Sequence, residues 1–134
     1  MMKVIGKSHQ KLDGKERVSG KAIYGHDIAL PNMLHGSILR AKYPCAEIIS
    51  IDTSKALALE GVECVITADD VDVNNIGYKK DHPILKKGTV NCNRDEIAAV
   101  AEQTKEIADK AIQLIEVEYK IKEGVYDPFE ALKE

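Results

Sequence analysis

The sequence predicts an α+β domain, built as a small mixed sheet with two or three short helices packed on it. The first observation is a strand–helix–strand pattern in residues 97–119. The second is a series of short strand-like segments upstream, separated by Gly and Pro. The third is composition: 44% of the residues are hydrophobic but only 4% are aromatic, so the core must be mostly Ile, Val, Leu and Ala.

Residues 97–119 contain the clearest periodic pattern of the chain. Residues 97–101 are a short apolar run, which predicts a buried strand. Apolar residues then recur at helical spacing over residues 107–115. Residues 115–119 alternate between apolar positions and the charged residues Glu116 and Glu118, which is typical of a half-buried strand. We therefore expect a βαβ-like unit.

Upstream of this unit we expect three further strands, at residues 33–41, 47–51 and 62–66. A short helix between the last two is predicted from Asp52-Thr53, which can cap it, to Glu60, with Gly61 as its stop.

Shorter elements complete the prediction. Thr67 and Asp70 have the spacing of a capping box and predict one helical turn. Residues 71–88 form the longest loop, residues 89–93 a short strand, and Pro128 begins a terminal helical stub.

The first residues differ from the rest in charge. Residues 1–26 carry six basic and two acidic residues, although the net charge of the chain is -3. No apolar face accompanies the lysines, so we expect residues 1–17 to be an irregular basic arm and residues 18–134 to be a single domain, beginning with an extended segment at 18–24. Without a global basic field, nucleic acid is not an expected partner.

Cysteine usage and hydropathy indicate the compartment. The three cysteines are far apart and form no Cys-x-x-Cys pair, so they predict free thiols and no iron–sulfur or zinc site. No apolar segment approaches the length of a membrane span or of a signal peptide. We expect a soluble cytoplasmic protein with no membrane partner.

Residues with catalytic potential are scattered. The four histidines lack metal-site spacing, and the pair Asp69-Asp70 is explained by the start of a helical turn. Arg94, Asp95 and Glu96 form a charged cluster just before the apolar run. A turn at a strand end can face a ligand or another domain, and it can equally be a plain surface turn. No complete active site is predicted: the sequence indicates no catalytic, cofactor-binding or metal residues.

Three stretches in a fixed order resemble a known family. They are Asp13, Val18, Gly20, Ala22, Tyr24 and Asp27-Ile28; then Met33-Leu34-His35-Gly36, Ile38-Leu39-Arg40, Ile51-Asp52-Thr53-Ser54 and Gly61-Val62; then Ala98-Ala99-Val100, Ile107-Ala108, Ala111 and residues 114–119. Together they resemble the α/β hammerhead domain at the N-terminus of the molybdenum-binding subunit of xanthine dehydrogenases and aldehyde oxidases.

The resemblance implies a fragment of an oxidoreductase that hydroxylates heterocycles or aldehydes. The complete enzyme would use molybdopterin, iron–sulfur clusters and FAD, and this chain would bind none of them. Its partners would be the remaining molybdenum-binding domains and the iron–sulfur and flavin subunits. Two departures from the family pattern are the Arg94-Asp95-Glu96 turn, where a Gly-x-Pro-like turn is usual, and Cys45, where a histidine is common.

Two hypotheses follow. In the first, the chain is a packing and assembly element of a molybdenum hydroxylase, is inactive alone, and exposes an apolar surface that causes self-association. In the second, it is a stand-alone, non-catalytic binding or interaction module.

Overall fold

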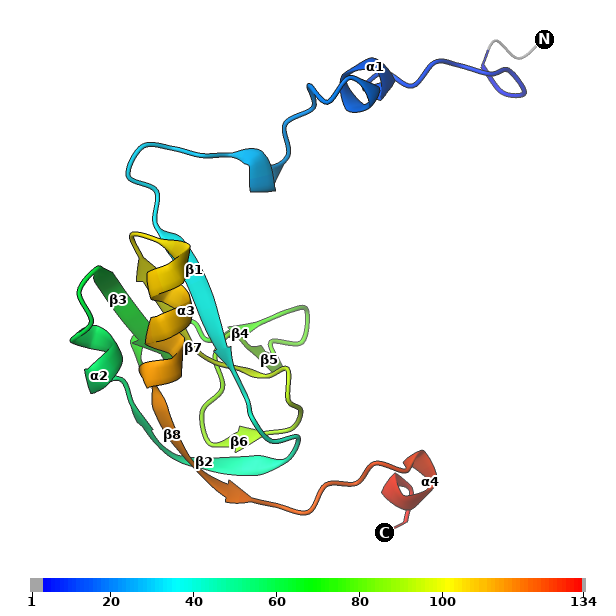
Figure 1. Cartoon of the computed structure of the whole chain (residues 1–134). Coiled ribbons are helices and arrows are strands. Elements are labelled where there is room, and N and C mark those ends of the chain that lie inside the picture. The colour runs from blue at the N-terminus through cyan, green and yellow to red at the C-terminus, as the bar shows by residue number, and fades with distance from the viewer. Residues whose placement is uncertain (1–3, 134) are drawn as a thin grey trace. The chain divides into compact units, whose positions relative to one another are not determined.

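The computed structural model describes residues 4–133, which divide into two compact units (Figure 1). The first ends at Pro31. It contains helix α1 (Gly14–Val18) and the 3-10 turn η1 (Gly25–Asp27), neither of which has a buried residue. The irregular arm predicted for residues 1–17 and the extended segment predicted to begin at Val18 are therefore wrong for residues 14–18. Arg17 pairs with Asp13 one turn earlier at 2.6 Å, so a local ion pair supports this helix without an apolar face.

The second unit begins at Asn32 and holds two three-stranded sheets and a small hairpin. The strands of the first sheet, in spatial order, are β1 (His35–Arg40), β7 (Glu96–Glu102) and β3 (Val62–Thr67). Those of the second are β6 (Thr89–Val90), β2 (Ala46–Asp52) and β8 (Glu116–Ile121). The hairpin pairs β4 (Asn75–Ile76) with β5 (His82–Pro83).

The α+β class is confirmed, with one difference in sheet organisation. The strand pairings within residues 4–133 are antiparallel, so the expected single mixed sheet is replaced by separate antiparallel sheets. The strand, helix and strand predicted in residues 97–119 are all present, but they do not form a βαβ unit. Strand β7 is already paired on both edges, with β1 and β3, so β8 pairs with β2 in the other sheet.

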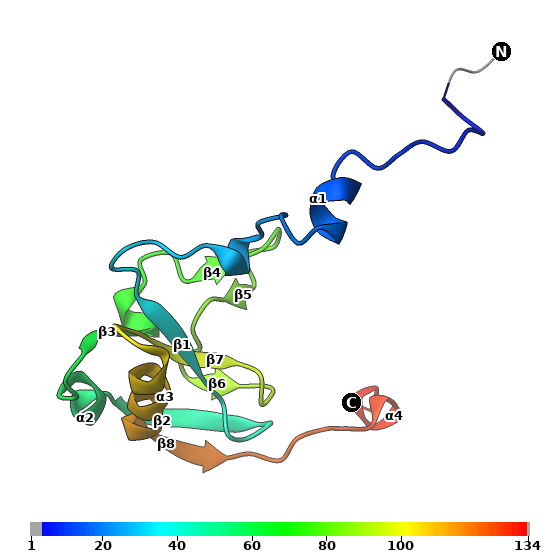
Figure 2. The same ribbon diagram turned by 45° about the horizontal axis from the view of Figure 1, so that its top comes forward.

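Helix α3 (Lys105–Leu114) covers one face of the first sheet. Figures 1 and 2 show it lying against β1 and β7. The Thr104 hydroxyl caps it by accepting a hydrogen bond from the Ile107 backbone N–H. The shorter helix α2 (Ser54–Leu57) ends before the predicted Glu60, and the chain then turns at Gly61, whose φ of 94° suits glycine.

Two further local predictions are confirmed. The 3-10 turn η2 (Ala68–Asp70) is closed by the predicted capping box, since the Thr67 N–H and hydroxyl both donate to the Asp70 carboxylate, at 2.8 and 2.9 Å. Helix α4 (Pro128–Ala131) begins at the expected proline, and Asp127 caps it.

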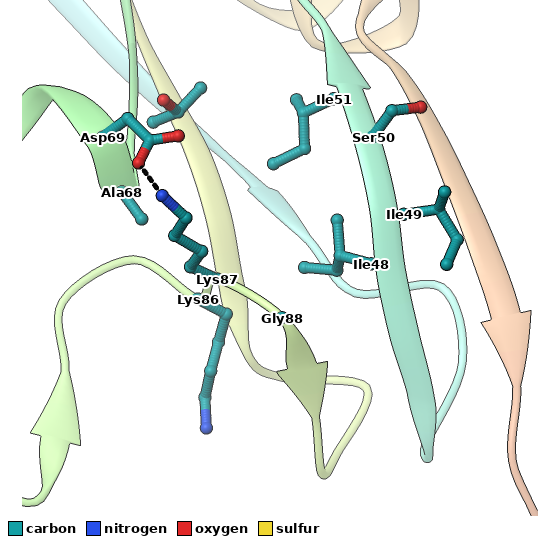
Figure 3. A pocket seen from close by; sticks show the side chains of 10 residues that line it. Ile48, Ile49, Ser50, Ile51, Ala68, Asp69, Lys86, Lys87 and Gly88 are labelled. Carbon is teal, nitrogen blue, oxygen red and sulfur yellow. Dashed lines mark hydrogen bonds and ion pairs between the residues drawn. The ribbon is translucent and has the colours of Figure 1, made fainter.

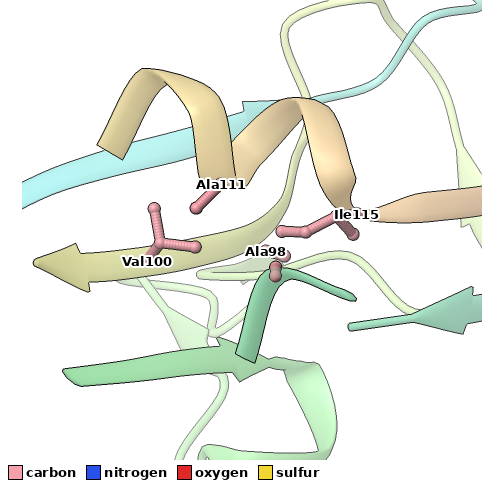
Figure 4. Close-up of a cluster of buried hydrophobic side chains, with 5 residues drawn as sticks. Ala98, Val100, Ala111 and Ile115 are labelled. Atoms are coloured by element: carbon pink, nitrogen blue, oxygen red, sulfur yellow. The ribbon is translucent and has the colours of Figure 1, made fainter. Parts of the chain in front are cut away.

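The core consists of small aliphatic side chains, as the composition predicts. One cluster lies between α3, α2 and the first sheet and contains Ala56, Ala98, Val100, Ala111 and Ile115 (Figure 4). A second cluster lies beside the second sheet and contains Ala41, Ala46, Val90 and Ile97. Alanines at these contacts allow the helix backbone to approach the sheet closely.

Candidate functional site

The charged cluster predicted before the apolar run forms a tight turn at residues 91–96, and Asp95 organises it. One Asp95 carboxylate oxygen accepts hydrogen bonds from the backbone N–H groups of Asn91, at 2.7 Å, and Cys92, at 3.3 Å. The other oxygen accepts from the Cys92 thiol at 3.4 Å. Asp95 is only 9% exposed. Its side chain therefore holds the turn together from inside.

The loop that precedes β6 supports the same carboxylate. The Lys86 ammonium lies 3.4 Å from Asp95 Oδ2, and the Lys86 backbone N–H donates to the Glu96 carbonyl at 2.6 Å. Burial alone would raise the pKa of Asp95, but the hydrogen bonds from Asn91 and Cys92 and the charge of Lys86 together lower it. Asp95 is therefore a fixed anion at neutral pH rather than an exchangeable proton carrier.

Arg40 fastens the outer side of the turn to β1. Its Nη1 donates to the Arg94 carbonyl at 2.6 Å and to the Glu96 carboxylate at 2.5 Å. Glu96 is half-buried, whereas the Arg94 side chain is exposed. Of the three residues singled out in the sequence, Asp95 and Glu96 thus make internal contacts and Arg94 is presented to the surroundings.

A groove of about 290 Å³ lies between strand β2 and turn η2 (Figure 3). Its walls come from residues 48–51, 67–69 and 86–88. Lys87 and Asp69 pair with each other on one wall, and the isoleucines of β2 line the opposite wall. The volume is at the lower limit for a small-molecule site. Sequence analysis missed this groove because its walls come from three separate segments.

The other candidates remain apart. Asp70 caps its turn and Asp69 pairs with Lys87, so the structural explanation of this carboxylate pair is confirmed. The three cysteines are free thiols, as predicted. Within residues 4–133, no three His, Cys, Asp or Glu side chains lie close enough together to hold a metal ion. No helix in this part of the chain is long and apolar enough to cross a bilayer.

One buried acid was not anticipated. Glu102, the last residue of β7, is fully buried, and neither of its carboxylate oxygens has a hydrogen-bond partner among the described residues. Burial, and to a lesser degree the charge of Asp109 on α3, raise the pKa of Glu102. Its position directly after a run of five apolar residues was the available signal in the sequence.

The fold and these contacts define the class of protein: an antiparallel α+β domain with a turn held by several side-chain hydrogen bonds and a shallow groove. Residues 19–123 match the family described as "Aldehyde oxidase and xanthine dehydrogenase, a/b hammerhead domain". The chain therefore belongs to this family, and the resemblance found in the sequence is confirmed.

Relatives with assigned names agree with the family. The chain is 44% identical over 128 residues to a probable xanthine dehydrogenase subunit of Bacillus subtilis (strain 168), covering 94% of this chain and 17% of that protein. It is 38% identical over 133 residues to the "Nicotinate dehydrogenase large molybdopterin subunit" of Eubacterium barkeri, covering 98% and 31%.

Solved structures share the fold over nearly the whole chain. The reconstituted CO dehydrogenase from Oligotropha carboxidovorans superimposes with a TM-score of 0.87 at 33% identity, covering 96% of this chain and 16% of that one. The chain thus spans between about a sixth and a third of the length of these relatives.

Proposed function

We propose that this chain is the hammerhead part of a larger molybdopterin-dependent oxidoreductase, a xanthine dehydrogenase-like hydroxylase of heterocycles or aldehydes. Its own role is packing and assembly, and it does not turn over substrate alone. The observation that carries the proposal is the family match over residues 19–123 in a chain that covers only 17% of its Bacillus subtilis relative.

The cysteines of this chain do not fit an iron–sulfur cluster of such an enzyme. An iron–sulfur cluster needs about four thiolates gathered at one point. Here Cys45 precedes β2, Cys64 lies within β3 and Cys92 lies in the 91–96 turn. Within residues 4–133, none of them belongs to a group of side chains that could hold a metal ion. The cofactors, and the chemistry that they supply, belong to other segments and subunits in this proposal.

We assign the 91–96 turn to contacts with the rest of the enzyme. Arg40 and Asp95 fix the backbone on both sides of Arg94 and leave its guanidinium exposed. A rigid turn presents an arginine at little cost in conformational entropy, which favours a charged contact to a carboxylate or phosphate. The expected neighbours are the remaining molybdenum-binding domains of the subunit and the iron–sulfur and flavin subunits.

Metal analysis of the natural gene product tests the proposal. We expect the purified natural protein to be several times longer than 134 residues and to contain molybdenum in stoichiometric amount, while the 134-residue chain alone contains none and associates weakly with itself. A natural product that ends after these residues and lacks molybdenum contradicts the proposal.

The groove at β2 favours one alternative, a stand-alone binding module. With its volume of about 290 Å³ and a paired lysine and aspartate in its lining, it could accept a small polar ligand. In that case a natural 134-residue product would carry a small molecule, and Lys87→Ala would abolish its binding, as measured by calorimetry with the extracted compound.

A further inference from the structure

The first sheet has a second face, opposite to α3, that we call the open face. Strand register places its side chains in two rungs, because directly opposed residues point to the same side. Its members are Gly36, Ala101 and Cys64 in one rung and Ile38, Ala99 and Ile66 in the other. None of the six carries a charge.

This face is exposed although its composition resembles that of a core. Ile38 is 47% exposed and Ile66 is 38% exposed, and Cys64 is exposed as well. Ala99 and Ala101, on the central strand, are only half-buried. Beyond the Gly36 rung, Leu34, Glu63 and Gln103 border a hollow of about 560 Å³, where the Gln103 amide donates to Glu63 at 2.9 Å. The apolar area therefore ends at a polar border.

The sequence of the central strand indicates that both faces of the sheet are buried in the complete protein. Residues 97–101 of β7 are continuously apolar, which is the pattern of a strand buried on both sides. A three-stranded sheet is roughly 10 Å wide between its outer strands, which is about the diameter of one helix. On the other face, helix α3 lies against β1 and β7, and the short helix α2 packs beside it against β3.

Size decides between the possible occupants. The open face has six residues, whereas a stable interface between two free proteins uses roughly 20 to 30 residues on each side. A second copy of this chain would gain little contact relative to the loss of translational freedom, so it would bind only weakly. A segment of the same polypeptide avoids most of that loss because its effective concentration is high.

We propose that the open face packs against one apolar helix from the part of the subunit polypeptide that lies outside these 134 residues. This inference rests on the proposed function, in which the chain makes up about a sixth of its subunit. The small side chains of Gly36, Ala99 and Ala101 let the helix approach closely along β7, between the ridges made by Ile38 and Ile66.

Cys64 provides the test because it lies within the open face. We compare its alkylation by a maleimide in the 134-residue chain and in the purified natural enzyme, with peptide mass spectrometry as the readout. Cys92, which is exposed on the 91–96 turn, serves as the reference thiol in the isolated chain. We expect both thiols to react in the isolated chain, and Cys64 to react at least about tenfold more slowly in the enzyme until it is unfolded.

The outcomes separate this inference from the proposed function. If the enzyme contains molybdenum and Cys64 still reacts as in the isolated chain, the open-face inference is wrong and the proposed function stands. If the natural product lacks molybdenum and ends at these residues, both fail. If Cys64 is already protected in the isolated chain at micromolar concentration, a second copy is the occupant and the inference is also wrong.

A pair of variants gives an independent check. Ala99→Leu places bulk in the middle of the open face, at a residue that is partly exposed in the isolated chain. We expect it to fold normally in the 134-residue chain but to reduce the yield of molybdenum-containing enzyme at least about fivefold, since an added side chain at a close contact is poorly tolerated. Ala99→Ser, which stays small, should preserve that yield. An unchanged yield for Ala99→Leu would overturn the inference.

Discussion

The two faces of the first sheet are made by the same three strands, yet they meet different surroundings. On the helix-covered face, Ala98 and Val100 are 0% and 3% exposed beneath α3. On the open face, the neighbouring Ala99 remains half-buried and the flanking Ile38 is 47% exposed. The apolar residues at the centre of both faces are small or aliphatic. Burial in this domain is therefore determined by which element packs on a face, and less by the composition of the strand.

The buried face of the sheet contains the more polar group, although burial normally disfavours charged side chains. The covered face includes Glu102, a buried acid without a hydrogen-bond partner among the described residues, while the open face has no ionisable side chain other than the Cys64 thiol. The face covered by α3 thus contains Glu102, the side chain whose burial costs the most free energy. The following predictions, from the largest expected effect to the smallest, test this contrast.

The most direct test places the same added side chain on each face. Ala98→Leu forces three extra carbon atoms into the cluster beneath α3 and should lower the free energy of unfolding by about 2–3 kcal/mol. Ala99→Leu, one residue along the same strand, should change it by less than about 0.5 kcal/mol in the isolated chain. Urea unfolding followed by circular dichroism measures both. Equal losses would show that the open face is already covered.

The second prediction concerns Glu102 and has a definite sign with pH. Because burial raises its pKa in the folded state, this acid contributes stability that is fully present below the pKa of the unfolded chain, and that stability is lost as the pH rises through the folded pKa. Glu102→Met should therefore raise the free energy of unfolding by about 1–2 kcal/mol at about pH 7.5. At about pH 4 the gain should nearly vanish.

Unfolding midpoints measured from about pH 4 to about pH 8 check this prediction. Glu63→Met is a suitable control, because Glu63 is exposed on the adjacent strand. A gain for Glu102→Met that is the same at both ends of the pH range would mean that the titration of this carboxyl is not the cause.

The third prediction addresses the helix that distinguishes the two faces. Thr104→Ala removes the cap of α3 and should cost about 1 kcal/mol, since the Ile107 N–H loses its side-chain partner. Thr104→Ser should retain most of the stability. Thermal unfolding of the isolated chain provides the measurement, and an equal loss in both variants would point to packing of the threonine methyl group instead of the cap.

The smallest effect is expected on the open face. Ile66→Ser should change the free energy of unfolding of the isolated chain by no more than about 0.5 kcal/mol, because the side chain is already 38% exposed. It should nevertheless reduce the binding of an apolar fluorescent dye, which reports exposed hydrophobic surface. A loss comparable to that of Ala98→Leu would contradict the distinction between the faces.

Local features of the fold could be predicted from the sequence because their causes are local. The strand and helix periods in residues 97–119, the capping box at Thr67 and Asp70, and the turn at Gly61 all depend on residues close together in the chain. The short helix at residues 14–18 was missed because it lacks the apolar face on which helix prediction relies; the exposed ion pair of Asp13 and Arg17 is only a small local support.

The candidate site was predictable only in part. The sequence drew attention to the turn at residues 94–96 but could not show which side chain faces inward. That is determined by Lys86, which pairs with Asp95, and by Arg40, which is 54 residues away from Arg94 in the chain. The groove at β2 likewise joins three segments that no sequence period connects.

The sequence by itself therefore determined the family, the α+β class, an aliphatic core and the faces of the main strands, because these follow from residue order and hydrophobic period. Only the tertiary structure decided that β7 lies between β1 and β3, which sends β8 to a second sheet, and that one face of β7 is covered while the other is open. The hydrophobic period of a segment specifies which of its side chains lie on the same face. Pairing and packing depend on contacts between distant segments, which are formed only when the whole domain folds.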